Sequence, residues 1–314
     1  MVSSPSRKSA AKSPSPAART KPRRPPAVRL DAAMACDAAF RVVARRCLKD
    51  LTAHHAATCQ GDADALHHMR IAVTRLRTAM SFFSPMVAGP QRTRIRAELK
   101  WLNSHLGVVR DLDVAIERLE EINQQSQQAD DRSWKQERAV SQRHLARVLR
   151  SARYQRLAKS TSAWVEKGAW SRKTGKSAAK LRACPVADYS TRQLARWQKK
   201  LVKKSCKLRE YGIKKRHRLR LLNKKLNYAI ESIADLIAGD EMKTQQATVK
   251  CLRKAQRSLG QLNDDARGRS LATTVGRGGA LASEPFLSPK REKRLLRNAA
   301  AAYKRLAELK PLRI

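Results

Sequence analysis

The segment from His67 to Arg77, HHMRIAVTRLR, mixes histidine and arginine with apolar residues at a spacing that predicts an amphipathic helix. On a helix turning about 100° per residue, positions i, i+3, i+7 and i+10 lie within about 80° of one another. His67, Arg70, Thr74 and Arg77 therefore share one face. The row spans about 15 Å, which fits several units of a linear polyanion better than one phosphate.

The residue types in this row suit phosphate oxygens. Arg offers a planar fork of donors, Lys supplies a compact charge, and a protonated His donates from both ring nitrogens. A basic row on a helix is nevertheless often only a solvated face.

A second row with the same spacing occurs 150 residues later, where His217 aligns with His67 and Arg220 with Arg70. The remaining aligned positions pair Thr74 with Lys224, Arg75 with Lys225, and Arg77 with Asn227. Because both rows begin with His-x-x-Arg, the repetition favours ligand binding over a solvated face. For the two histidines the sequence leaves a structural role and a ligand contact equally open.

The repeat continues downstream, where LKWLNSHLGVVRDLDV aligns with LRKAQRSLGQLNDDAR and Lys100 pairs with Arg253. Both segments contain a glycine, Gly107 or Gly260, which costs about 1 kcal/mol relative to Ala inside a helix. We therefore expect a tight turn at each glycine, with Asp111 and Asp264 capping the next helix. Arg110, paired with Asp111, is a further candidate ligand.

The net charge supports a polyanionic partner. The 314 residues carry a formal charge of +42, and +34 remains when residues 1–30 are left out. The folded part is therefore cationic itself, and self-repulsion at this density favours an anionic partner.

The composition predicts an all-α protein, because Leu and Ala supply most of the core and turn residues are few. Together with the repeat it predicts two pseudo-symmetric four-helix bundles from an internal duplication. We expect a disordered basic tail at 1–30, a first bundle half at 31–170, a linker at 171–187 and a second bundle half at 188–314.

Signs of catalysis are poor. Phosphate-loop, dinucleotide-binding, zinc-protease and nucleophile-elbow motifs are missing, and the six cysteines lack metal or disulfide spacing. We therefore expect no enzymatic activity, no metal and no cofactor, although a phosphoacceptor role for His67 or His217 remains a minor alternative. The longest uncharged stretch, TAMSFFSPMVAGPQ, is too short to span a membrane, and we expect a cytoplasmic protein.

Five segments resemble the CHAD domain, the conserved histidine α-helical domain, over about residues 31 to 310. They are HHMRIAVTRLRTA, LKWLNSHLGVVRDLDV, RSARYQRL, RHRLRLLNKKLNYAIE and SLGQLND. The resemblance implies an all-helical fold with a basic groove that binds inorganic polyphosphate, and location at polyphosphate granules.

By position, the resemblance makes His67 and His217 the namesake histidines. It implies as basic ligands Arg70, Arg75, Arg77, Arg220, Lys224 and Lys225, with Lys100 and Arg253 from the following helices. Thr74 and Asn227 depart from the basic residues expected there. The Glu-x-Glu-x-Lys strand of the CYTH triphosphatase domain, which accompanies many relatives, is missing from the sequence, so hydrolysis is not expected.

A nucleoid-associated DNA-binding protein is the alternative. Its basis is the Lys-, Pro- and Ala-rich tail, which is similar to the tails of histone-like proteins. Duplex backbone binding needs basic residues but no aromatic ones.

Overall fold

The computed structural model describes residues 29–126, 132–172, 175–275 and 287–314. These residues form α-helices and short 3-10 helices without a strand, apart from one isolated bridge between Ala35 and Pro185. The all-α prediction is therefore confirmed. Most of the expected tail lies outside the described residues, but Leu30 is buried, and its backbone N–H donates to Asp235 Oδ2 (3.3 Å).

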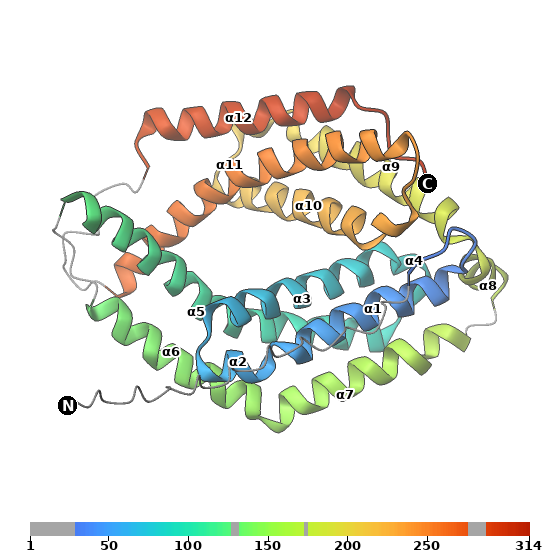
Figure 1. Cartoon of the computed structure of the whole chain (residues 1–314), viewed down its shortest axis with the longest axis horizontal. Coiled ribbons are helices and arrows are strands. Elements are labelled where there is room, and N and C mark those ends of the chain that lie inside the picture. The colour runs from blue at the N-terminus through green and yellow to red at the C-terminus, as the bar shows by residue number, and fades with distance from the viewer. Residues whose placement is uncertain (1–28, 127–131, 173–174, 276–286) are drawn as a thin grey trace, which may run out of the picture.

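The first half of the fold is the lower layer in Figure 1. Its helices are α1 (Cys36–Ala53), α2 (His55–Gln60), α3 (Ala63–Phe82), α4 (Ser84–Val87), α5 (Pro90–Ser126), α6 (Arg132–Arg150) and α7 (Ala152–Lys167). Four of them, α1, α3, α5 and α7, contact one another in a closed ring. The other long helix, α6, packs against α5 and α7.

The second half forms the upper layer. After η1 (Ala169–Arg172) and α8 (Lys176–Ala183) come α9 (Val186–Ser205), η2 (Leu208–Glu210), α10 (Ile213–Ser232), η3 (Ala234–Leu236), α11 (Glu241–Val275) and α12 (Pro289–Glu308). Helices α9 to α12 form a second closed ring. The two rings meet where α3 and α10 lie side by side (Figure 1), and α5 also contacts α11. An internal duplication as their origin stays a prediction.

Local sequence sets the start of α3. Gly61 has a φ of 95°, a left-handed conformation that glycine adopts without strain, and it ends α2. The Asp62 side chain then accepts from the backbone N–H of Ala65 (2.8 Å) and caps α3. This turn places the row that begins at His67 on the first turns of α3.

Aromatic side chains join the two halves at the C-terminal end of α3. Phe82 and Phe83 pack against Tyr189 of α9, and the Tyr189 hydroxyl donates to the Phe82 carbonyl (2.6 Å). Phe40 of α1 contacts Phe83 and Trp164 edge-on. This core holds α3 in place between the rings.

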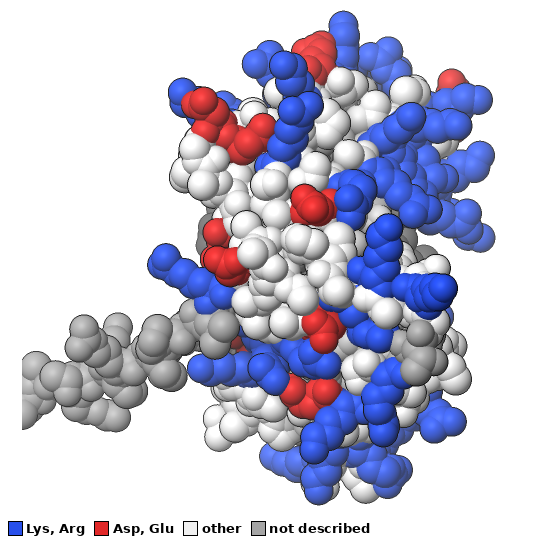
Figure 2. Space-filling view, turned by 90° about the vertical axis from the view of Figure 1, so that its right-hand side faces the viewer, with Lys and Arg blue, Asp and Glu red and all other residues white. Residues whose placement is uncertain are grey.

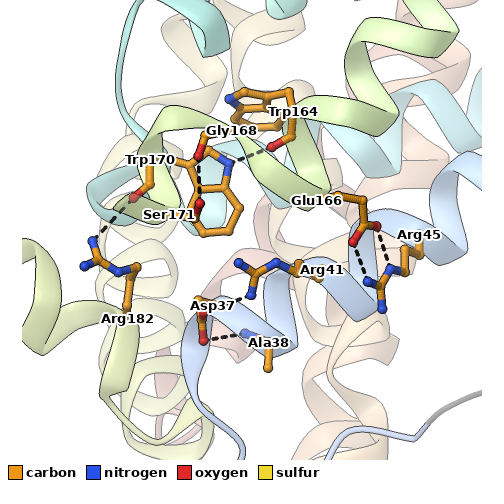
Figure 3. Close-up of polar contacts among 10 residues, drawn as sticks. All are labelled: Asp37, Ala38, Arg41, Arg45, Trp164, Glu166, Gly168, Trp170, Ser171 and Arg182. Atoms are coloured by element: carbon orange, nitrogen blue, oxygen red, sulfur yellow. Dashed lines mark hydrogen bonds and ion pairs between the residues drawn. The ribbon is translucent and has the colours of Figure 1, made fainter. Parts of the chain in front are cut away.

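The end of α7 closes onto α1 (Figure 3). The Trp170 indole N–H donates to the Trp164 carbonyl (2.8 Å), and Arg41 lies over the Trp170 ring. Gly168 lies between the two tryptophans, where a Cβ atom would be 2.4 Å from the Trp164 carbonyl oxygen. Only glycine fits this close approach.

The expected turns at Gly107 and Gly260 are wrong, because α5 and α11 each continue through their glycine. Neither Asp111 nor Asp264 caps a new helix. The buried row on α5 crosses the glycine at helical spacing: Leu99, Leu102, Leu106, Val109 and Leu112. Burying such a row stabilises the helix by more than the roughly 1 kcal/mol that one glycine costs.

The segment 171–187, expected to be a linker, contains α8, which contacts α1 and α4. Backbone hydrogen bonds also join it to the start of the fold, from Cys36 N to Cys184 O (3.0 Å) and from Val186 N to Met34 O (2.8 Å). The segment therefore packs onto the first half, and the proposed domain limits stay a prediction.

None of the helices in the described ranges combines the length and the apolarity that a membrane span needs.

Candidate functional site

The basic rows of α3 and α10 meet where these helices lie side by side. We call the group formed by His67, Arg70, Arg110, Arg220, Lys224 and Arg267 the central cluster. Burial lowers the pKa of Arg70, and the charges of Arg267, Arg110 and Arg220 lower it further, against the opposing effect of Asp111. The arginines of the two halves therefore act on one another.

Lys224 shows the same coupling across the helix pair. Burial, together with the charges of Arg220 and Arg70, lowers its pKa to about 8. Partial burial likewise lowers the pKa of His67, with further contributions from Arg110 and Lys224. An anion placed here would relieve repulsion between several groups at once.

A second group of basic residues combines Arg77 of α3 and Lys225 of α10 with side chains from α5 and α9. We call Arg77, Arg92, Arg96, Lys200 and Lys225 the distal cluster. Burial and the charges of Arg96, Arg77, Lys200 and Arg92 lower the pKa of Lys225. The Arg92 side chain also donates from Nε to the Met80 carbonyl (3.1 Å) at the end of α3, which fixes its position.

Some of these cations lack protein partners. Within the described ranges, Arg77 Nε and Arg220 Nε are buried donors with no hydrogen-bond acceptor. Gly260 lies beneath Arg220, where a Cβ atom would be 4.0 Å from the guanidinium nitrogens. Arg46 Nε and Arg216 Nε lack an acceptor as well, but their guanidinium groups form ion pairs with Asp235 and Glu292. Arg77 and Arg220 form no such pair with a described residue, so their positive charges remain available to an anion.

Asp111 is a carboxylate that contacts the central cluster, and the charge of Asp264 acts on Lys224 of the same cluster. Asp111 Oδ1 lies 3.7 Å from Arg70 Nη1, and its Oδ2 pairs with Arg267 of α11. The expected Arg110–Asp111 pair is wrong, because Arg110 instead pairs with Glu117, two turns further along the same face of α5 (3.0 Å). Successive residues on a helix point about 100° apart, which explains the difference.

Three expected ligands are not members of the two clusters as defined, and two of them, Arg75 and Arg253, pair with a carboxylate. Arg75 pairs with Glu231 (3.1 Å) and lies over the Tyr228 ring, and Arg253 is 3.7 Å from the same carboxylate. Glu231 therefore offsets one of their two positive charges. Lys100 is exposed on α5, one turn beyond Arg96, so it extends the edge of the distal cluster.

The two histidines differ in their surroundings. His217 Nδ1 donates to Asn263 Oδ1 (2.6 Å), which fixes the ring against α11. At the equivalent place His67 faces the charge of Arg110, whose aligned residue is Asn263. His217 therefore has a structural contact, whereas the partly exposed His67 belongs to the central cluster and faces its positive charges.

The sequence analysis missed Arg92, Arg96, Lys200 and Arg267. A signal for two of them existed, because Arg92, Arg96 and Lys100 form an i, i+4, i+8 row on α5. The turn expected at Gly107 would have ended this helix, so α5 was not predicted as one unit. Arg267 and Lys200 join the clusters only through tertiary packing.

Positive charge dominates one side of the molecule. Figure 2 views the molecule from the right-hand end of Figure 1. In this view Lys and Arg are concentrated on the right, whereas most Asp and Glu lie in the middle and on the left. No group of three His, Cys, Asp or Glu side chains in the described part of the chain lies close enough to hold a metal ion. The site's chemistry is therefore that of cationic donors.

Comparison with known proteins agrees with this architecture. The family model of the CHAD domain matches residues 42–273. The crystal structure of the CHAD domain from the plant Ricinus communis is similar, with a TM-score of 0.71 and 24% identity over 93% of this chain and 98% of that one. PptA from Streptomyces chartreusis has a TM-score of 0.57 and 14% identity, over 87% and 96%. No curated protein matches the sequence.

Proposed function

Because this chain belongs to the CHAD domain family, we propose that it binds inorganic polyphosphate, without a catalytic step, through the central and distal clusters. CHAD domains are linked to polyphosphate binding, and the all-helical fold is shared with the Ricinus communis domain. The two clusters supply the cationic donors that such a ligand needs.

The unpaired buried donors Arg220 Nε and Arg77 Nε are the observation that carries this proposal. Each belongs to a different cluster, and each has the donor geometry that phosphate oxygens accept. Beside Arg220, Lys224 has a pKa of only about 8, because burial and the charges of Arg220 and Arg70 destabilise its charged form. A bound anion would offset the positive charge of both guanidinium groups and favour the charged form of Lys224.

The distance between the clusters favours a polymer over a single phosphate. Arg70 and Arg77 are seven residues apart on α3, which corresponds to about 10 Å along the helix. A linear polyanion can reach both clusters with consecutive units, whereas one phosphate ion can neutralise only one of them. Binding at polyphosphate granules follows if the polymer there remains accessible.

Chain length provides the test. We expect the protein to bind long-chain polyphosphate much more tightly than triphosphate at equal phosphate concentration, with an affinity that falls steeply with salt. Equal affinity for both at every salt concentration would contradict the proposal.

Competition with duplex DNA distinguishes the polyphosphate proposal from the DNA-binding alternative. The basic tail falls outside the described residues, so the comparison uses the full chain and a chain that starts at residue 29, which keeps the buried Leu30. Under the polyphosphate proposal the shortened chain keeps its polyphosphate affinity. Under the DNA alternative, the full chain binds DNA more tightly than polyphosphate, and the shortened chain no longer does.

A further inference from the structure

A third basic surface lies between α9 and α10, and Lys225 is the one expected ligand among its lining residues. It is a cavity of about 550 Å³, which we call the α9–α10 groove. Its lining consists of Lys200, Lys204, Lys207, Tyr211, Lys215, Arg218, Leu219, Leu221, Leu222 and Lys225.

The lining of the groove is entirely cationic or apolar. Its six charged residues are Lys or Arg, and the lining contains no carboxylate. Leu219 is buried at the base, and Lys215 Nζ lies 5.7 Å from the centre of the Tyr211 ring. Apolar walls of low polarisability strengthen the field of charges of one sign, so the groove attracts anions more strongly than a flat lysine surface would.

The groove is continuous with the distal cluster. Lys200 and Lys225 line the groove, and the same two lysines belong to the group whose charges act on one another beside Arg77. A polymer bound along α3 and α10 therefore meets the groove opening without crossing a carboxylate among its lining residues.

We propose that the α9–α10 groove is an extension of the polyphosphate site, which holds units of a long polymer beyond those bound by the two clusters. This inference rests on the proposed function. The chemistry of the groove fits this task, because five of its six cations are lysines. Lysine binds phosphate as a mobile point charge, which suits a polymer without fixed register, whereas the arginines of the central cluster offer fixed forks.

Three lysines of the groove can be removed without touching either cluster. Lys204, Lys207 and Lys215 are exposed, and the test variant is Lys204→Gln/Lys207→Gln/Lys215→Gln. The matched control is Lys49→Gln/Lys159→Gln/Lys180→Gln, which removes the same charge from exposed positions on α1, α7 and α8. Both variants are made in the full chain and titrated with triphosphate and with long-chain polyphosphate.

We expect the groove variant to bind long-chain polyphosphate roughly tenfold more weakly than the control, with a shallower salt dependence. Its affinity for triphosphate should equal that of the control, because the clusters are intact. Equal affinity of the groove variant and the control for long-chain polyphosphate would refute the extension. An equal loss of affinity for triphosphate and for long-chain polyphosphate in the groove variant would also refute it.

The variant Arg70→Ala/Arg220→Ala shows whether a negative result refutes only the groove extension or the proposed function as well. When it loses binding and the groove variant does not, the clusters bind polyphosphate and only the extension is wrong. When the unaltered chain fails to prefer the long polymer, the proposed function itself is wrong, and the inference falls with it.

Discussion

Asp111 on α5 lies 3.7 Å from Arg70 on α3, and its other carboxylate oxygen pairs with Arg267 on α11. One carboxylate thus joins arginines from both halves of the fold. In the absence of a ligand it occupies the position of an anion between them. Under the proposed function it would compete with phosphate for the same donors.

Replacing this carboxylate should strengthen ligand binding. For Asp111→Asn we expect an affinity for long-chain polyphosphate several-fold higher at low salt, because Arg70 and Arg267 gain free donors. The loss of stability should stay below about 1 kcal/mol, since both pairs are partly exposed to solvent. Titration and thermal unfolding of the variant measure both effects. Weaker binding would show instead that Asp111 positions Arg70 for the ligand.

The lowered pKa of Lys224 makes stability depend on pH. Its pKa is about 8 in the folded protein and 10.5 ordinarily, so between these values the unfolded chain binds more protons. The free energy of unfolding should therefore rise as the pH increases from about 8 to 10.5. Denaturant titrations at several pH values measure this rise, which Lys224→Gln should reduce.

Ligand binding should change the protonation of the same lysine. A polyanion raises the pKa of Lys224, so binding just above pH 8 should take up protons, and affinity should fall as the pH rises further. Calorimetry in two buffers with different protonation enthalpies detects this uptake. An equal uptake by the Lys224→Gln variant would assign the proton to another group.

Gly168 and Gly107 offer a contrast in stability. A Cβ atom at Gly168 would lie 2.4 Å from the Trp164 carbonyl oxygen and 2.6 Å from Trp170 Cδ1, so Gly168→Ala should destabilise the protein by about 1–3 kcal/mol. At Gly107 a Cβ atom meets nothing within 4 Å, and Gly107→Ala should stabilise α5 by up to about 1 kcal/mol. Chemical denaturation measures both. Equal effects would contradict the packing at Trp164.

The fold class was predictable because periodic apolar rows determine helices locally. The continuity of α5 and α11 through their glycines was not predictable. The sequence shows the cost of one glycine, but the burial that offsets this cost depends on tertiary packing. For Leu30 and α8, too, the sequence did not predict the tertiary contacts. Their sequences are typical of tail and linker, but contacts with distant residues bring both into the fold.

The candidate site was predictable in part. Spacing alone placed Arg70 and Arg220 at equivalent positions, and the structure brings their charges within reach of one another. The sequence could not show that Glu231 neutralises Arg75, because the two residues are 156 positions apart. Arg267 was missed for the same reason, since it reaches the central cluster only where α11 contacts α5.

The central claim, that donors from both halves hold one polymer, is tested most directly with Arg70→Ala/Arg220→Ala against the control Arg143→Ala/Arg291→Ala, which removes two exposed arginines on α6 and α12. Each charged hydrogen bond contributes about 1.5–3 kcal/mol, so we expect affinity for long-chain polyphosphate to fall roughly 100-fold or more. Helical circular dichroism should be unchanged, and the control should bind almost normally. Equal affinities of the two variants would contradict the account.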